Sequence, residues 1–175
     1  MTIVIIIVAI IALPFVLALF TKKSYSIERS ILINRPVNVV FDYLKHIKNQ
    51  DQFSKWVQMD PNMKKEYRGA DGTVGFVYAW NGNKQAGEGE QEIKGIVENR
   101  KLDIEVTFIR PFAAVAKTPF TTEAVEVNET RVTWGMSSAM NYPMNIMLLF
   151  MNMEKLLGKD LEFSLQQLKD KLENQ

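Results

Sequence analysis

The carboxyl group of Glu154 is a candidate general acid or base in this sequence. It lies in a series of residues spaced alternately three and four apart, and most of that series is apolar. This spacing is typical of one side of a helix. A carboxyl group buried among apolar side chains has a raised pKa and can exchange a proton near neutral pH. The alternative, which we favour, is a solvent-facing or ion-paired glutamate on a curving helix.

The other polar side chains offer little further chemistry. Tyr78, Arg110 and Lys117 are the remaining groups that could project into an interior and act on a substrate. His46 is the single histidine, and it follows a stretch with helical spacing. A helix C-terminus favours a cation, so we expect a structural role there. The glutamates at alternate positions of 88–92 share one face of a strand, which we interpret as a solvated outer face and not a metal site.

The composition excludes several kinds of site. The chain has no cysteine and one histidine, which excludes disulfides, thiolate zinc sites, a cysteine nucleophile and a multi-histidine metal centre. Its net charge of +1 provides no basic field for nucleic acid. We therefore expect no cofactor, no metal ion and no nucleic-acid partner.

The elements that must position these residues follow from periodicity and turn signals. Alternating residues predict a strand over 25–34, and Pro36 then begins a helix in which apolar residues recur at helical spacing. A second short helix is predicted over 49–56. The segment after it has the pattern of an antiparallel meander. Its strands are predicted at residues 64–68, 73–80, 85–98, 102–109, 118–127 and 131–140.

The last segment, 143–173, is predicted to form one long helix. Its second half has the buried stripe of an amphipathic helix. Its first half, 144–153, is apolar nearly all round and rich in methionine, a residue that adapts to varied apolar partners. Gly158 costs about 1 kcal/mol of helix propensity relative to alanine. A glycine here therefore indicates a bend or a close approach to the sheet.

Three local patterns, in this order, resemble the START-like or SRPBCC superfamily over residues 25–173, and the polyketide cyclase/dehydrase type is nearest. The patterns are ILINRP at 31–36 with VFDY at 40–43 and KW at 55–56, then GEG at 87–89 with IVEN at 96–99, and then GKD at 158–160 with Leu165, Leu168, Lys169 and Glu173. The resemblance implies an α+β helix-grip fold, a curved antiparallel sheet wrapped around the long C-terminal helix. It also implies a mostly apolar cavity that binds lipids, sterols, polyketides or other hydrophobic molecules, on which some members act as enzymes.

Aromatic residues share strand faces that would line such a cavity, provided that those faces are the concave ones. The methionines of the last helix would then meet them from the other side. Ordinary core packing is the alternative for the same residues, and Trp56 lies either at the mouth or over the sheet. The candidate ligand-binding residues are Trp56, Phe76, Tyr78, Trp80, Val106, Phe108, Trp134, Met136, Met144, Met147 and Met151.

The run from Ile3 to Phe20 is apolar and uncharged, and Lys22 and Lys23 close it. It would be about 27 Å long as a helix, close to the thickness of a bilayer's hydrocarbon core. We therefore predict a transmembrane anchor over 1–23 and a START-like domain over 24–175. The two lysines favour a cytoplasmic domain. A cleaved signal peptide with its site near 16–18 is the alternative, and it would give a secreted or periplasmic domain.

These observations predict a membrane-anchored domain that binds a hydrophobic small molecule or a lipid, and they favour binding over catalysis. One alternative is an enzyme of the polyketide cyclase/dehydratase type acting on an apolar substrate. Another is a protein-interaction module that docks a partner on the apolar segment 144–153.

Overall fold

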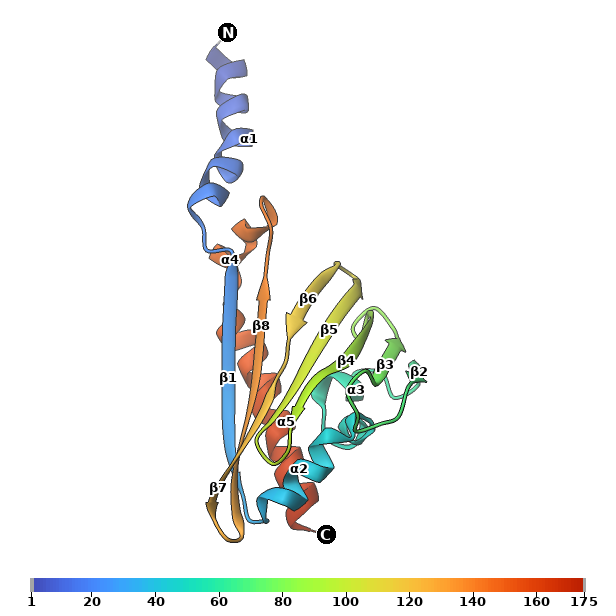
Figure 1. Ribbon diagram of the computed structural model, residues 1–175. Helices are drawn as coiled ribbons and strands as arrows, with labels where there is room; N and C mark the ends of the chain where they lie inside the picture. The colour runs from blue at the N-terminus through green and yellow to red at the C-terminus, as the bar shows by residue number, and fades with distance from the viewer. Residues whose placement is uncertain (1, 175) are drawn as a thin grey trace.

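A curved antiparallel sheet wraps against a C-terminal helix, and a separate apolar helix stands at the N-terminal end (Figure 1). The computed structural model describes residues 2–174, with side chains described at residue 6 and residues 10–174. The helical elements are α1 (Thr2–Phe20), α2 (Val37–Lys45), η1 (Ile47–Gln52), α3 (Lys55–Gln58), η2 (Met144–Ile146), α4 (Met147–Phe150) and α5 (Met153–Glu173). The strands are β1 (Ser24–Ile33), β2 (Lys64–Arg68), β3 (Val77–Asn81), β4 (Glu88–Val97), β5 (Lys101–Arg110), β6 (Ala114–Lys117), β7 (Phe120–Glu126) and β8 (Glu129–Ala139).

The sheet follows the order β1-β8-β6-β5-β4-β3-β2, and β7 pairs with both β5 and β8. All of these pairings are antiparallel, and β1 pairs with β8 along its whole length, from Ser24 opposite Ala139 to Ile33 opposite Thr130. The predicted α+β class, with a curved antiparallel sheet and a C-terminal helix, is confirmed. The arrangement is consistent with the helix grip.

Two strand predictions need correction. The strand predicted over 73–80 begins only at Val77, because Gly72 and Gly75 adopt φ angles of +82° and +86° and keep the preceding segment in a turn. The strand β6 (Ala114–Lys117) was not predicted at all. Two of its four residues are alanine, so it carries little of the alternation between large apolar and polar side chains that marks a strand.

The single helix predicted over 143–173 is broken. Met151 adopts an extended conformation between α4 and α5. Asn152 then caps α5, since its side chain accepts a hydrogen bond of 2.9 Å from the backbone N–H of Lys155. The break separates the methionine-rich segment from the amphipathic helix. It also moves Glu154 from mid-helix to the first turn of α5.

The core lies between α5 and the inner face of the sheet. The predicted stripe of α5 is buried there, and it consists of Leu161, Leu165, Leu168 and Leu172. The helix after Pro36 buries Val40, Phe41 and Leu44 in the same cluster. Burial of a large apolar side chain stabilises a fold by roughly 1.5–3 kcal/mol. These two stripes therefore hold α2 and α5 against the sheet.

The helix α1 occupies the apolar run at the N-terminus, with Pro14 inside it. Its described side chains are mostly exposed, and those at 2–5 and 7–9 lie outside the described residues. Within the described part of the chain, the structure contains no helix that is both long and apolar enough to cross a membrane. The spanning anchor therefore stays a prediction.

Candidate functional site: an uncharged cavity between sheet and helix

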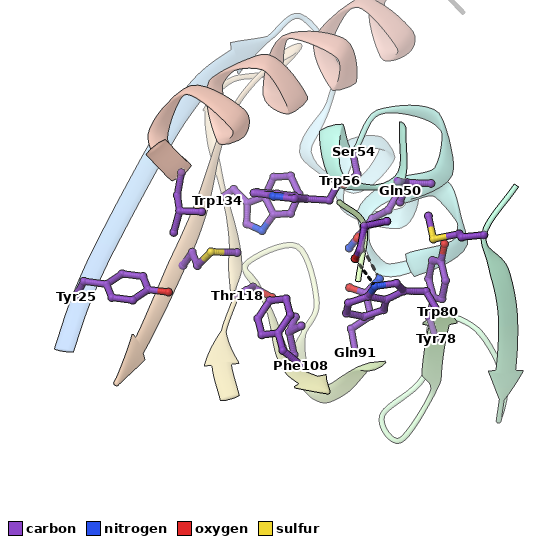
Figure 2. Close-up of a pocket in the computed structure, with 16 residues that line it drawn as sticks. Tyr25, Gln50, Ser54, Trp56, Tyr78, Trp80, Gln91, Phe108, Thr118 and Trp134 are labelled. Carbon is purple, nitrogen blue, oxygen red and sulfur yellow. Dashed lines mark hydrogen bonds between the residues drawn. The ribbon is translucent and has the colours of Figure 1, made fainter. Parts of the chain in front are cut away.

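A cavity of about 230 Å³ lies between the inner face of the sheet, α3 and α5 (Figure 2). Apolar and aromatic side chains form most of its wall. It brings together the larger part of the candidate set, namely Trp56, Tyr78, Trp80, Val106, Phe108, Trp134 and Met136. Trp56 thus lies at the cavity and does not merely cover the sheet. Residues that sequence analysis missed complete the wall: Tyr25, Gln50, Ser54, Val57, Met63, Ala86, Gln91, Thr118 and Leu157.

Four candidates do not line the cavity. Phe76 is fully buried just before β3 and stacks on Tyr67, with ring centroids 6.3 Å apart, so it serves the packing around the sheet. Met144, Met147 and Met151 lie away from the cavity, because the break before α5 takes their segment out of the helix that faces the sheet. Met151 instead lines a groove near the end of α1.

Contacts between aromatic rings hold the cavity wall in place. The ring of Trp134 stacks on Phe120 at 4.4 Å and meets Trp56 edge to face at 5.4 Å. Across the cavity, Trp80 and Phe108 meet edge to face at 6.1 Å. Such pairs contribute about 0.5–1.5 kcal/mol beyond the burial of their area. These contacts therefore restrict the orientations of the wall rings Trp56, Trp80, Phe108 and Trp134.

Gln50 and Gln91 place two amide groups at the cavity wall (Figure 2). Both are buried, and Nε2 of Gln91 donates a 3.2 Å hydrogen bond to Oε1 of Gln50. The Nε2 of Gln50 and the Oε1 of Gln91 have no hydrogen-bond partner among the described residues. One donor and one acceptor are thus free for a ligand.

A signal for Gln91 was present in the sequence. It occupies an inward position of β4, in phase with the buried Gly89 and Ile93, while the neighbouring glutamates point outward. A polar residue at an inward strand position is a candidate for ligand recognition. No comparable signal marks Gln50, because it lies in the irregular helix η1.

The hydroxyl of Tyr78 is engaged by an acidic group. It donates a 2.8 Å hydrogen bond to Oδ1 of Asp51, whose Oδ2 lies 2.7 Å from Nζ of Lys65. Burial of the phenol, together with its bond to the Asp51 carboxylate, raises the pKa of Tyr78 above its usual value. Tyr78 therefore stays protonated at neutral pH and is a poor proton donor or acceptor.

The other acid–base candidates lie outside the cavity. Glu154 is exposed and forms an ion pair with Arg29, with Nη1 and Oε1 2.7 Å apart, as in the interpretation favoured from sequence. Arg110 is also exposed and pairs with Glu88 at 2.6 Å, and Lys117 is exposed on β6. Among the residues that the structure describes, no Asp, Glu, Lys, Arg or His lines the cavity.

The remaining polar candidates have structural partners. The glutamates at 88, 90 and 92 form ion pairs with Arg110, Arg68 and Lys94 outside the cavity. Nδ1 of His46 lies 2.8 Å from the backbone oxygen of Asp42. Within residues 2–174, no group of three or more His, Cys, Asp or Glu side chains could hold a metal ion.

Comparison with known sequences identifies one protein family. The family model described as "Polyketide cyclase / dehydrase and lipid transport" matches residues 24–173. This match covers all of β1 to α5 and leaves out α1. No curated protein matches the sequence.

Solved structures share the fold at low sequence identity. Norcoclaurine synthase from Thalictrum flavum, in complex with dopamine and hydroxybenzaldehyde, is 9% identical, with a TM-score of 0.61 over 89% of this chain and 88% of that one. Aha1 from Colwellia psychrerythraea, a dimer in solution, is 17% identical, with a TM-score of 0.58 over 85% and 96% of the two chains. A protein from Chromobacterium violaceum is 10% identical, with a TM-score of 0.60 over 85% and 96%.

Proposed function

Since this chain belongs to the polyketide cyclase/dehydrase and lipid transport family, we propose that it binds one uncharged, largely apolar small molecule in the cavity beside α5. The main observation in support of this proposal is the chemical character of the cavity wall. Aromatic and aliphatic side chains surround the buried amides of Gln50 and Gln91, and no charged side chain of the described residues accompanies them.

The uncharged wall disfavours the binding of a charged ligand. An ionised ligand would lose its hydration inside the cavity without meeting a counter-ion, which costs at least several kcal/mol. A hydroxyl or carbonyl group, in contrast, can pair with the free Nε2 of Gln50 or the free Oε1 of Gln91. The amides thereby orient one end of a molecule whose remainder contacts Trp80, Phe108 and Trp134.

The size of the cavity narrows the ligand class. An apolar cavity of about 150 Å³ is known to hold benzene. At about 230 Å³ this cavity suits one or two rings, or a single short chain. A whole two-chain phospholipid exceeds this volume, so the lipids we propose are single-chain or isoprenoid-like molecules with an uncharged polar end.

We further propose that α1 anchors the domain in a membrane, with the domain on the cytoplasmic side. The uncharged apolar sequence of residues 3–20, part of which lies outside the described side chains, and the Lys22–Lys23 pair after it support this assignment. An apolar ligand concentrates in the bilayer. A cavity tethered there meets the ligand at a higher effective concentration than a freely diffusing one.

The enzyme alternative finds less support. Tyr25 and Tyr78 are the titratable side chains that line the cavity among the described residues, and burial is the first cause that raises the pKa of each. Neither exchanges a proton readily at neutral pH. A docking role for 144–153 has one supporting observation, the exposure of Leu149 and Phe150 on α4.

The proposal can be tested with the fluorescence of the protein itself. The chain has three tryptophans, Trp56, Trp80 and Trp134, and all of them line the cavity. Bromine quenches tryptophan on contact, so the full-length protein in lipid nanodiscs is titrated with bromodecanol and, at pH 8, with bromodecanoate. We expect saturable quenching by the alcohol and at least tenfold weaker quenching by the carboxylate. Equal quenching by both, or none by the alcohol, would refute the proposal.

Native mass spectrometry of the detergent-extracted protein gives an independent result. We expect the full-length chain to carry a bound neutral molecule in the size range of the cavity. A variant with Trp134→Ala serves as a comparison, because it enlarges the cavity and removes a stacked wall. It should lose the native occupant. An interior that is always empty would contradict the binding function.

A further inference from the structure

A groove of about 700 Å³ runs between the end of α1, the start of β1 and α4. It adjoins the cavity. Tyr25 lines both spaces, and Figure 2 shows its ring projecting from β1 toward the cavity. On α5, Met153 lines the groove and Leu157, one helical turn later, lines the cavity. The groove and the candidate site therefore lie on either side of Tyr25.

Asn145 fixes α4 beside the end of α1. This side chain is fully buried, and its Nδ2 donates hydrogen bonds to the backbone oxygens of Ala18 at 2.6 Å and Thr21 at 3.1 Å. The oxygen of Ala18 also accepts a long backbone hydrogen bond of 3.4 Å from Thr21, so Asn145 reinforces the chain where it leaves the helix. The segment η2–α4 is thereby held where the chain leaves α1 (Figure 1).

The surface around this junction is largely apolar and carries two lysines, and the one carboxylate among the described residues of the groove lining, that of Glu154, is paired with Arg29. Phe20 is 86% exposed, Leu149 56% and Phe150 82%, which is unusual for large apolar side chains that lie close together. Lys22 and Lys23 are exposed beside them. Apolar side chains flanked by lysines are typical of segments that enter the boundary between lipid headgroups and acyl chains, where the lysines reach anionic headgroups.

We propose that α4, with Phe20, Lys22 and Lys23, inserts into the surface of the membrane that holds α1, and that the groove admits the ligand from this lipid phase into the cavity. The proposal rests on the membrane anchor and the ligand-binding cavity of the proposed function. We infer that the bilayer covers this surface, because the surface adjoins the end of α1 and carries lysines that anionic lipid headgroups attract.

The contact with lipid can be measured at a single site, since the chain contains no cysteine. Phe150→Cys carries an environment-sensitive fluorophore in the full-length protein, reconstituted in vesicles of phosphatidylcholine and phosphatidylglycerol. Val127→Cys is the matched control, because Val127 is 88% exposed in the turn between β7 and β8, at the far end of the sheet from α1 (Figure 1). We expect doxyl-labelled lipid to quench the fluorophore at 150 at least twofold more than the one at 127. Equal quenching would overturn the membrane contact and would favour a protein partner for this surface.

The proposed entry of the ligand through the groove is tested by measuring how fast the ligand fills the cavity. Vesicles loaded with bromodecanol deliver it to the full-length protein, and tryptophan quenching follows its arrival. The variant Leu149→Ser with Phe150→Ser should fill at least fivefold more slowly than the natural chain or Val127→Ser, with the same final quenching. Equal rates with normal final quenching would overturn the passage alone. Absence of quenching in the natural chain would instead refute the binding function, and the passage with it.

Discussion

The guanidinium group of Arg29 on β1 occupies the space that a side chain on Gly158 of α5 would fill. From this position Arg29 reaches Glu154 at 2.7 Å and Glu162 at 2.5 Å, one helical turn to either side of the glycine. Gly158 is therefore explained by a close approach between helix and strand, one of the two interpretations that the sequence allowed.

Gly158→Ala should gain less stability than the helix propensity of alanine predicts. The new Cβ would overlap the guanidinium of Arg29, which is the end of a flexible side chain and must therefore shift away from Glu154 and Glu162. The loss of both exposed ion pairs offsets a propensity gain of about 1 kcal/mol. We expect urea denaturation to show no net gain for the single variant, but a gain for Gly158→Ala when Arg29 is already alanine. A single variant about 1 kcal/mol more stable than the natural chain would contradict the close approach.

The paired amides of Gln50 and Gln91 give a second prediction. Gln91→Leu leaves the buried amide of Gln50 without its hydrogen bond, which costs about 1–3 kcal/mol. The double variant Gln50→Leu with Gln91→Leu leaves no such amide unpaired. In urea denaturation we therefore expect it to be more stable than Gln91→Leu alone. The double variant should still bind bromodecanol more weakly, by about tenfold, because a hydrogen bond to the ligand is lost. Unchanged affinity would show that the amides do not contact the ligand.

Periodicity accounts for most of what the sequence predicts correctly. The strand predicted over 102–109 and the stripe Leu161–Leu172 follow from alternation and helical spacing, because each buries one face against the core. The aromatic residues of the cavity wall follow from the same alternation together with the family resemblance. Such patterns are predictable from sequence because the residues that face the core must be apolar.

Features set by single residues or distant contacts were missed. The break at Met151 depends on one capping side chain, Asn152, inside an apolar run that otherwise continues the helical pattern. Tyr25 and Gln50 reach the cavity only because α5 and η1 pack against a sheet assembled from distant strands. Neither position shows a local signal, since tertiary packing alone determines what these side chains face.

The cap at Asn152 leads to a third prediction. Asn152→Ala removes the side-chain acceptor for the backbone N–H of Lys155, and loss of an N-cap costs about 1 kcal/mol. We expect urea denaturation to show this loss. Asn128→Ala, in the exposed turn between β7 and β8, is the control and should change stability far less. A loss no larger than that of the control would show that α5 does not depend on this cap.

The buried hydroxyl of Tyr78 predicts how stability depends on pH. Burial and the hydrogen bond to Asp51 raise its folded-state pKa above the unfolded value of 10.0. The folded state therefore holds the phenolic proton more tightly than the unfolded chain. The stability from this difference is fully present below pH 10 and is lost as pH rises further.

Tyr78→Phe isolates this contribution. The variant loses the hydrogen bond to Asp51, so we expect it to be about 1 kcal/mol less stable at pH 8. Between pH 9 and pH 11 its unfolding free energy should fall less steeply than that of the natural chain, because the remaining tyrosines and lysines titrate equally in both proteins. Urea denaturation at a series of pH values measures both slopes. Parallel slopes would mean that the phenol of Tyr78 is not protonated more strongly in the folded state than in the unfolded one.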